Sequence, residues 1–306
     1  MFKRLFLPYL IGLLALVGVG LLLYPIAANW FHQLDQSRVM KNYVEEIGSL
    51  QPDKDEQLAA AHSYNEALSS GAQLDSWANV ASGTGSLVGK AGEEIWPYQK
   101  LLRSDEDGVM GRIKIAKIDV DLPIYHGTDE DTLLKAAGHL EGTSLPVGGA
   151  STRAVITAHR GLASAKLFTD LDKLGVGDEF VIEVFDDAYA YKIIETKVVA
   201  PEETEELRAV KDKDLASLVT CTPLGINSHR ILVTGERIFP TPKDAQDEAG
   251  KPSDLPHFPW WAVGAAAALL LIGTFVTRET LLAWGAAKRA KRQDSEKPQC
   301  GPRRAI

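Results

Sequence analysis

Two stretches of the chain, residues 5–28 and 258–277, are largely apolar and contain no charged residue. A helix of about 20 apolar residues is long enough to span the hydrocarbon core of a bilayer. Each stretch is therefore predicted to form a transmembrane helix. The chain between them mixes polar and apolar residues and is predicted to fold outside the membrane.

Basic residues orient these two helices. Lys3 and Arg4 precede the first, and five basic residues lie between positions 278 and 292, after the second. Because basic residues collect on the cytoplasmic side, both ends of the chain are predicted to be cytoplasmic and residues 30–257 extracellular. The first stretch also has a feature of a cleaved signal peptide, since small residues lie near its end, at 27–28. Its length, and the interfacial aromatic residues at 30–31, favour a retained helix.

Residues 35–47 and 53–68 have the spacing and composition of helices, and Asp53 or Asp55 is placed to cap the second. These helices are expected either to form a stalk or to dock more specifically. Residues 69–92 are rich in Gly and Ser and are predicted to form a long loop. Loops of this length are uncommon in compact domains unless they are functional or disordered.

From residue 111 onward the pattern becomes that of β-strands. Residues 112–115 alternate between polar and apolar side chains, and residues 121–125 form a second short strand whose proline is typical of a sheet edge. Further strands are predicted at 155–159, 179–185, 190–199, 218–220 and 231–234, with short helices at 131–137 and 164–174. Many short strands with few helices predict an all-β barrel or sandwich.

Charge and cysteine content narrow the classes of function. A net charge of −8 argues against a nucleic-acid binder. Of the two cysteines, Cys300 lies in the predicted cytoplasmic tail and Cys221 in the predicted extracellular part, so they cannot pair. An unpaired extracellular cysteine is a candidate reactive thiol, although free cysteines are often buried and inert. A redox role would require a resolving cysteine outside, and no metal-ligand spacing or cofactor motif occurs, so neither metal nor cofactor is expected.

Residues 215–238 predict a β-hairpin, with Cys221 at the end of its first strand and Arg230 at the start of its second. Antiparallel pairing would bring these two side chains together. A neighbouring fixed cation favours the thiolate, which is the nucleophilic form of cysteine. His159 ends the apolar strand 155–159, just before a glycine turn, and is the candidate proton carrier.

Three motifs lie at predicted strand ends: Thr-Ala-His-Arg-Gly at 157–161, Leu-Val-Thr-Cys-Thr-Pro at 218–223 and Asn-Ser-His-Arg at 227–230. Together and in this order they resemble the sortase family, most closely its class C, pilin-polymerising branch. The resemblance is dense over residues 101–238. It implies an all-β fold, a closed eight-stranded β-barrel with short inserted helices, N-terminal helices and a transmembrane helix at each end. The hydrophobic pattern alone does not choose the barrel over the sandwich.

With this resemblance the chain divides into six expected regions. They are an N-terminal transmembrane helix (1–28), extracellular helices with a lid loop (29–100), a catalytic barrel (101–239), a linker (240–257), a C-terminal transmembrane helix (258–277) and a basic cytoplasmic tail (278–306).

The resemblance implies a cysteine transpeptidase that cuts a Leu-Pro-x-Thr-Gly-like (LPxTG-like) sorting motif between Thr and Gly. Cys221 would attack the Thr carbonyl and form a thioester, His159 would transfer protons, and Arg230 would stabilise the oxyanion or orient the substrate. Thr220 is a candidate substrate contact, although its side chain should face away from that of Cys221. No Asp or Asn is identified as a third triad member, so slow turnover is expected.

Class C sortases are expected to carry a lid with an Asp-Pro-aromatic motif. This chain has Asp75-Ser76-Trp77, without the proline. The resemblance implies that Asp75 pairs with Arg230 and that Trp77 covers Cys221. Loss of the proline leaves the open loop more conformations and should disfavour closure. The alternative is an ordinary linker in which Trp77 packs on the surface.

The class C resemblance also implies the partners: pilin or surface proteins with an LPxTG-like motif, a lysine amine acceptor on a pilin subunit, and the lipid bilayer. The second span, the N-terminal extension and the Asp-Ser-Trp segment favour this interpretation. Three alternatives remain open. They are a housekeeping sortase that uses a cell-wall precursor amine, a hydrolytic cysteine endopeptidase, and a membrane-tethered binding module without activity.

Overall fold

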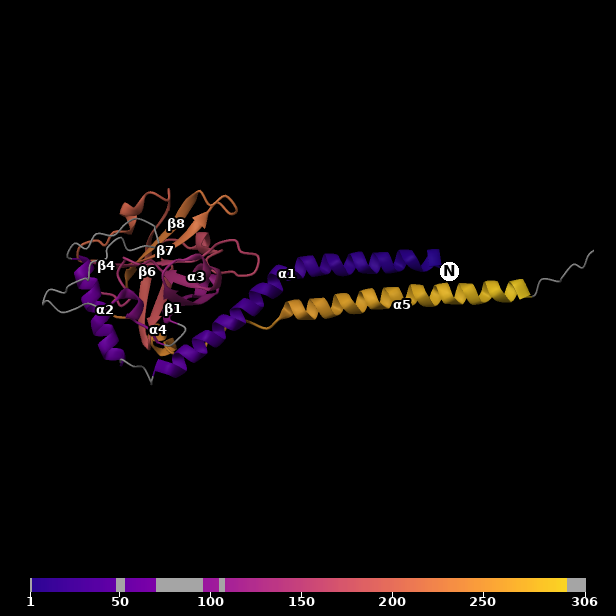
Figure 1. Ribbon diagram of the computed structural model, residues 1–306, viewed down its shortest axis with the longest axis horizontal. Coiled ribbons are helices and arrows are strands. Elements are labelled where there is room, and N and C mark those ends of the chain that lie inside the picture. Colours follow the sequence, from indigo (N-terminus) through magenta and orange to yellow (C-terminus); the bar gives the residue numbers. More distant parts are fainter. Residues whose placement is uncertain (1, 48–52, 70–95, 105–107, 296–306) are drawn as a thin grey trace, which may run out of the picture. The chain divides into compact units, whose positions relative to one another are not determined.

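The computed structural model describes residues 2–47, 53–69, 96–104 and 108–295 (Figure 1). The chain forms two compact units. One comprises residues 28–257, and the other comprises residues 1–27 together with 258–306.

Eight strands form a closed β-barrel in the unit of residues 28–257. They are β1 (Val109–Ile115), β2 (Val120–His126), β3 (Ala137–His139), β4 (Thr152–Thr157), β5 (Glu179–Val184), β6 (Asp187–Val199), β7 (Asp214–Thr222) and β8 (His229–Arg237). Around the barrel the order is β1-β2-β3-β4-β7-β8-β6-β5, and β5 closes the ring by pairing with β1. Only the β2–β3 and β4–β7 pairs are parallel. The predicted closed eight-stranded barrel is therefore confirmed.

Apolar side chains at alternate strand positions fill the barrel. Ile113 faces Ile182 across the β1–β5 ladder, and Leu218 faces Val233 across the β7–β8 ladder, all four being completely buried. Burial of large aliphatic side chains stabilises a fold by about 1.5–3 kcal/mol each. Gly235 of β8 permits this packing, because a Cβ atom there would lie 2.7 Å from Cε1 of the Phe180 ring.

Pro123 does not mark an edge strand. β2 lies between β1 and β3 in the closed barrel, so that sequence prediction is wrong. The β2–β3 ladder begins at Ile124, which pairs with Ala137, and Pro123 lies just before it. The missing N–H of the proline is tolerated because the short strand β3 does not extend to Pro123 and offers no carbonyl group to pair with it.

Two N-terminal helices dock on the barrel. α1 (Phe2–Glu46) runs without a break through the first apolar stretch and the predicted helix at 35–47, and α2 (Lys54–Ser69) corresponds to the predicted helix at 53–68. The Tyr43 hydroxyl of α1 is buried and accepts a hydrogen bond from Phe185 N at 2.6 Å. Asn65 of α2 exchanges two hydrogen bonds with the Leu145 backbone, at 3.0 and 2.7 Å. Of the two expectations, stalk or docking, the structure supports docking.

The remaining elements of this unit are short. They are η2 (Tyr98–Lys100), η3 (Ala116–Ile118), α3 (Glu130–Lys135), η4 (Leu171–Lys173), η5 (Thr204–Leu207) and α4 (Lys243–Glu248).

The predicted helix at 164–174 is wrong, because only η4 in this segment is helical. The backbone N–H groups here bind partners elsewhere in the chain. Lys166 N donates to the Asn29 side chain at 2.7 Å, and Phe168 N donates to His159 O at 3.0 Å. These bonds pull Leu167 and Phe168 into the core, where both are buried. Tertiary packing therefore overrides a helical pattern.

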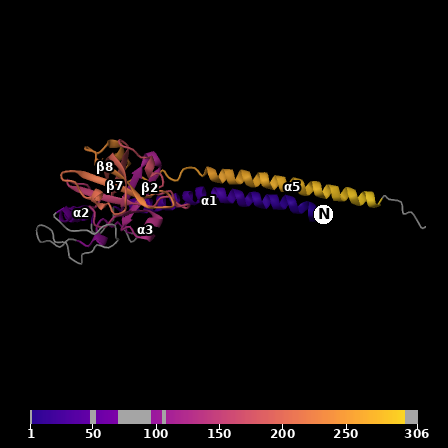
Figure 2. The same cartoon turned by 90° about the horizontal axis from the view of Figure 1, so that it is seen from above.

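The other unit contains the first residues of α1 and the helix α5 (Trp260–Ser295), which lie side by side in both views (Figures 1 and 2). Both helices are long and apolar enough to cross a membrane, and their apolar windows are only 6% and 0% buried. Gly12 lies close to α5, since a Cβ there would meet Val276 Cγ2 at 2.9 Å. Two such exposed apolar helices suggest membrane association.

Candidate active site

The β7–β8 hairpin places Cys221 directly opposite Arg230. The three residues before the cysteine, 218–220, are at most 1% exposed, so β7 is fixed up to the nucleophile, whereas Cys221 itself is partly exposed. Its thiol is free. Opposed residues of an antiparallel pair project on the same face. The thiol and the guanidinium therefore share one face of the hairpin, as the sequence predicts.

The loop that joins the two strands, residues 223–228, is held by hydrogen bonds at both ends. Asn227 N donates to Pro223 O at 2.9 Å. From the other side, Nη1 of Arg230 donates to Asn227 O at 2.9 Å and to His229 O at 3.0 Å. The arginine therefore stabilises the loop beside the thiol as well as presenting positive charge there.

His159 reaches the same place from β4. This strand runs parallel to β7 with Thr157 beside Val219, and Ala158 N donates to Val219 O at 3.2 Å. His159 follows two residues after Thr157, as Cys221 follows two residues after Val219. The three candidate catalytic residues therefore lie at or just beyond the neighbouring ends of β4, β7 and β8, at one edge of the barrel.

The His159 imidazole is held loosely. Its side chain is 25% exposed. Among the residues that the structure describes, Nε2 has no hydrogen-bond partner although it is shielded from solvent. The Glu130 carboxylate lies 3.8 Å from Nε2 and is 75% exposed, so water weakens this ion pair. A shielded ring nitrogen without a fixed partner is suited to exchange a proton with a bound substrate.

Thr220 does not face the substrate side. Its side chain is 1% exposed, and its hydroxyl donates to Ala158 O at 2.8 Å. In a regular strand it points away from the face of Cys221. Thr220 therefore ties β7 to the backbone just before His159, and the expected substrate contact is not supported.

Two residues near the site were missed by the sequence reasoning. Glu130, at the start of α3, lies 29 positions before His159, and nothing in the sequence links them. Arg160 directly follows the histidine within the Thr-Ala-His-Arg-Gly motif, and its ion pair with Asp172 was not foreseen. The signal for Arg160 was present, since a charged residue after a buried strand requires a partner.

The two lid residues, Asp75 and Trp77, lie outside the described residues, and their predicted roles stay predictions. Two other histidines have structural roles, as expected. The His126 ring lies against Leu101 O at 2.7 Å, and the His139 ring lies between the Tyr98 hydroxyl and Ser144 O, both at 2.9 Å. Complete burial lowers the pKa of His139 from 6.5 to about 4.

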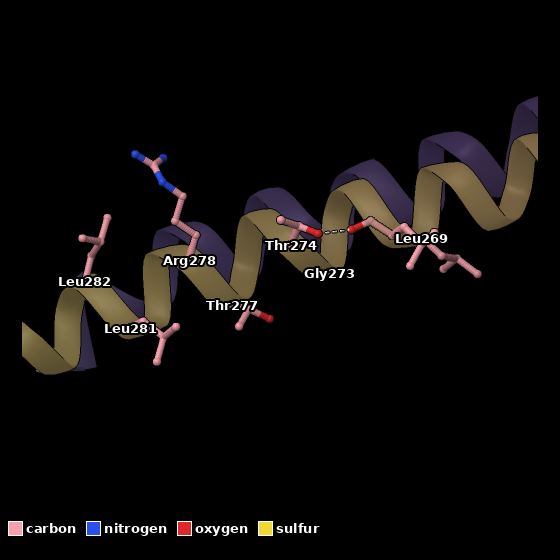
Figure 3. A pocket seen from close by; sticks show the side chains of 8 residues that line it. Leu269, Gly273, Thr274, Thr277, Arg278, Leu281 and Leu282 are labelled. Atoms are coloured by element: carbon pink, nitrogen blue, oxygen red, sulfur yellow. Dashed lines mark hydrogen bonds between the residues drawn. The ribbon is translucent and has the colours of Figure 1, made fainter.

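Two hollows among the described residues are lined by residues other than Cys221, His159 and Arg230. No group of three or more His, Cys, Asp or Glu residues within the described part of the chain is placed to hold a metal ion. A hollow of about 760 Å³ follows one side of α5 and is lined mainly by Leu, Thr and Gly residues (Figure 3). It lies on an apolar helix and offers no nucleophile or acid–base group, so it is not assigned to catalysis.

Comparison with known proteins identifies the family. The family model of the sortase domain matches residues 113–238. The crystal structure of sortase C1 from Streptococcus agalactiae is 38% identical, has a TM-score of 0.57, and its match covers 66% of this chain and 98% of that chain. Sortase C-1 from Actinomyces oris is 45% identical with a TM-score of 0.52, over 60% of this chain and 97% of that one. The chain belongs to the sortase family, and these structural neighbours are class C sortases.

Curated relatives match over a shorter region. Sortase D of Bacillus subtilis is 29% identical over 131 residues, which is 42% of this chain and 63% of the relative. Sortase A of Bacillus anthracis is 27% identical over 136 residues, which is 44% of this chain and 62% of the relative. The chain thus spans less than two thirds of these two relatives.

Proposed function

We propose that this sortase is a membrane-anchored extracellular cysteine transpeptidase. It cleaves an LPxTG-like sorting motif between Thr and Gly and transfers the acyl group to a lysine amine of a pilin subunit. The observation that supports the proposal most is that Cys221 and Arg230 oppose each other at the ends of β7 and β8, while His159 follows the neighbouring end of β4. Those three side chains are the nucleophile, proton carrier and cation that acyl transfer through a thioester requires.

In the first half-reaction the Cys221 thiolate attacks the Thr carbonyl carbon. The S–C bond forms, and negative charge develops on the carbonyl oxygen, which the Arg230 guanidinium stabilises. The C–N bond then breaks, and protonated His159 gives its proton to the leaving glycine amine. The products are a thioester on Cys221 and a free amino-terminal glycine peptide.

In the second half-reaction the incoming lysine amine attacks the thioester carbonyl. Neutral His159 takes a proton from this amine, the new C–N bond forms, and the S–C bond breaks. Cys221 leaves as thiolate, and the enzyme returns to its starting charge state. Hydrolysis would follow the same route with water in place of the amine, so exclusion of water decides between transferase and endopeptidase.

The pilin acceptor is supported by the class C structural neighbours and by the helices α1 and α2 that dock on the barrel. In this proposal Asp75 pairs with Arg230, and Trp77 covers Cys221 until the substrate arrives. The two apolar helices anchor the enzyme, with both ends of the chain cytoplasmic and the barrel outside. The second candidate, a housekeeping sortase with a cell-wall acceptor, shares the same catalytic residues.

The acyl-enzyme tests this proposal. The full-length chain in detergent micelles is mixed with a Leu-Pro-x-Thr-Gly peptide, and intact mass is measured. We expect a gain equal to the acyl fragment. Cys221→Ala removes the gain, while Cys300→Ser retains it and is the matched control. Trp77→Ala should increase the gain if the lid restricts access.

Acceptor preference separates the two candidates. A lysine-bearing pilin peptide and a cell-wall stem peptide with a free amine are supplied in equal amounts to the acyl-enzyme. Preferential linkage to the lysine side chain supports pilin polymerisation, whereas preferential linkage to the stem peptide supports the housekeeping function. Absence of an acyl adduct in the wild type and in Trp77→Ala, across several motif variants, would support a binding module instead.

A further inference from the structure

The Arg160 side chain is mostly shielded from solvent beside the candidate active site, and its guanidinium contacts three residues in two segments of the chain. Its side chain is only 8% exposed and forms an ion pair with the Asp172 carboxylate of η4 through Nη2. Nη1 donates to the Thr222 hydroxyl at 3.1 Å, and Nε donates to Thr169 O at 3.0 Å. Such a fork of fixed donors can hold several partners in one geometry.

The positions of Arg160 and Thr222 in the chain explain why their contact matters for the candidate active site. Arg160 follows His159 directly in the chain, and Thr222 follows Cys221 directly. The bond from Arg160 to Thr222 therefore links the backbone segment that carries the proton carrier to the segment that carries the nucleophile.

The Arg160–Thr222 hydrogen bond connects the two segments beyond the point where β4 and β7 are paired. β4 ends at Thr157, two residues before His159, and among the described residues the last backbone hydrogen bond between the β4 and β7 segments runs from Ala158 N to Val219 O. Beyond that point the geometry depends on other bonds. The Thr220 hydroxyl donates to the Ala158 carbonyl, and Arg160 donates to the Thr222 hydroxyl.

A second contact joins the same two segments. Gly161 has a φ of +80°, and a Cβ atom there would lie 2.5 Å from Cδ2 of Leu224. Leu224, in the loop after Cys221, therefore rests on the turn after His159. The glycine is needed both for the left-handed backbone and for this close approach.

We propose that Arg160 is a positioning residue for acyl transfer: it fixes the spacing of His159 and Cys221 by binding Thr222, while Asp172 and Thr169 hold the guanidinium in place. The inference rests on the proposed function. It predicts that loss of the contact lowers turnover rather than substrate binding. A displacement of about 1 Å in a catalytic group costs about 100-fold in rate.

The test uses the full-length chain in detergent micelles, and kcat and KM are measured for transfer of a Leu-Pro-x-Thr-Gly peptide to a lysine amine. Arg160→Met should lower kcat about 10- to 100-fold, with KM changed less than about 3-fold. Arg160→Lys should not restore the rate, because one ammonium group cannot reach Asp172, Thr222 and Thr169 together. Arg208→Met is the matched control, because Arg208 is 73% exposed and pairs with the equally exposed Glu205, and we expect unchanged kcat.

Thr222→Val gives an independent measurement in case Arg160→Met folds poorly. It preserves the side-chain shape and removes the acceptor oxygen, and we expect kcat to fall about 3- to 10-fold. Combined with Arg160→Met, it should add little further loss, because both changes remove the same contact. A purely structural role would lower the melting temperature without this kcat–KM split or this non-additivity.

Three results would overturn the inference: wild-type kcat in folded Arg160→Met, full rescue by Arg160→Lys, or simple additivity of the two substitutions. Failure of the proposed function is distinguishable from these, because it would be seen in the wild type as absence of transfer. If the wild type and Arg160→Met transfer the acyl group equally well, the positioning role of Arg160 is rejected and the proposed function stands.

Discussion

Arg112 and Arg160 show how the same type of side chain can serve two different purposes. Arg112 of β1 is 1% exposed, binds Asp121 through two hydrogen bonds of 2.6 Å and lies 3.5 Å from Glu183. The Arg160 side chain is 8% exposed and binds Thr222, the residue after Cys221. Arg112 lies on β1, whereas Arg160 follows β4, three places away in the ring of eight strands.

The difference lies in what each arginine holds. Arg112 donates to Lys251 O at 2.7 Å, and Lys114 donates to Glu248 O at 3.1 Å, so the cluster fastens the segment after β8 onto the barrel wall. That cluster contains no nucleophile or substrate-facing group. We therefore expect Arg112 to stabilise the fold and Arg160 to set the geometry of catalysis.

The histidines show the same contrast. Both ring nitrogens of His139 have close partners in the buried core, whereas Nε2 of His159 has none among the described residues. A histidine with fixed partners holds a structure together, and one with a nitrogen left unbonded can exchange protons. The following predictions separate stability from turnover at paired sites, beginning with the largest effect.

Loss of the proton carrier should have the largest effect. His159→Gln is expected to lower the rate of acyl transfer by about 10²- to 10⁴-fold, the range typical of general acid–base catalysis, with a nearly unchanged melting temperature. Steady-state transfer kinetics and thermal denaturation are measured on the same sample. Transfer at more than a tenth of the wild-type rate would mean that another group carries the proton.

Arg112→Met should destabilise the fold by about 3–5 kcal/mol, because it leaves the mostly buried Asp121 carboxylate without its arginine partner and removes the Arg112–Glu183 ion pair. The rate of transfer per folded molecule should stay within about 2-fold of the wild type. Lys213→Met is the control, since Lys213 and Glu236 form a half-exposed pair at 2.9 Å, worth less than about 1 kcal/mol. Chemical denaturation compares the three proteins, and an Arg112→Met variant as stable as the control would contradict this assignment.

Stability should fall on acidification because of His139. Burial lowers its folded-state pKa to about 4 from 6.5, so the unfolded chain binds a proton that the folded chain excludes. The stabilisation is complete above pH 6.5 and is lost as the pH falls toward about 4, by about 3 kcal/mol at about 1.4 kcal/mol per pKa unit. We expect the pH dependence of the unfolding free energy to flatten in this range in His139→Gln. An equally steep curve in that variant would assign the effect to other groups.

Thr220→Val should have the smallest effect, about 1 kcal/mol in unfolding free energy, because it removes one hydrogen bond and leaves Ala158 O without that partner. KM should not change, since the side chain is buried away from the substrate. A several-fold rise in KM would instead support the substrate contact that the sequence suggested.

The sequence predicted the β7–β8 hairpin and the pairing of Cys221 with Arg230, because both depend on local signals. An apolar run, a Pro-Gly-Asn loop and a second apolar run determine which residues oppose each other, so Cys221 was placed opposite Arg230 correctly. His159 was found in the same way, at the end of an apolar strand. The closed barrel came from the family resemblance, because strand pattern does not distinguish a barrel from a sandwich.

What the sequence could not supply depends on contacts between distant residues. The segment at 164–174 has a helical pattern, yet bonds to Asn29 and His159 give it an irregular backbone. Glu130 lies near His159 because α3, in the connection between β2 and β3, folds toward the end of β4. The sequence shows Arg160 beside His159 but does not show which residues it contacts, because its partners lie 9 to 62 positions away in the chain.

The most direct test of the central claim is product analysis of the full-length enzyme with a Leu-Pro-x-Thr-Gly peptide and a lysine-bearing acceptor. Products are separated and identified by mass and fragmentation. The account predicts cleavage between Thr and Gly and a new amide between Thr and the lysine side chain, with no product in Cys221→Ala. Release of the free Thr carboxylate alone, at a rate unaffected by the acceptor, would contradict it and identify a hydrolase.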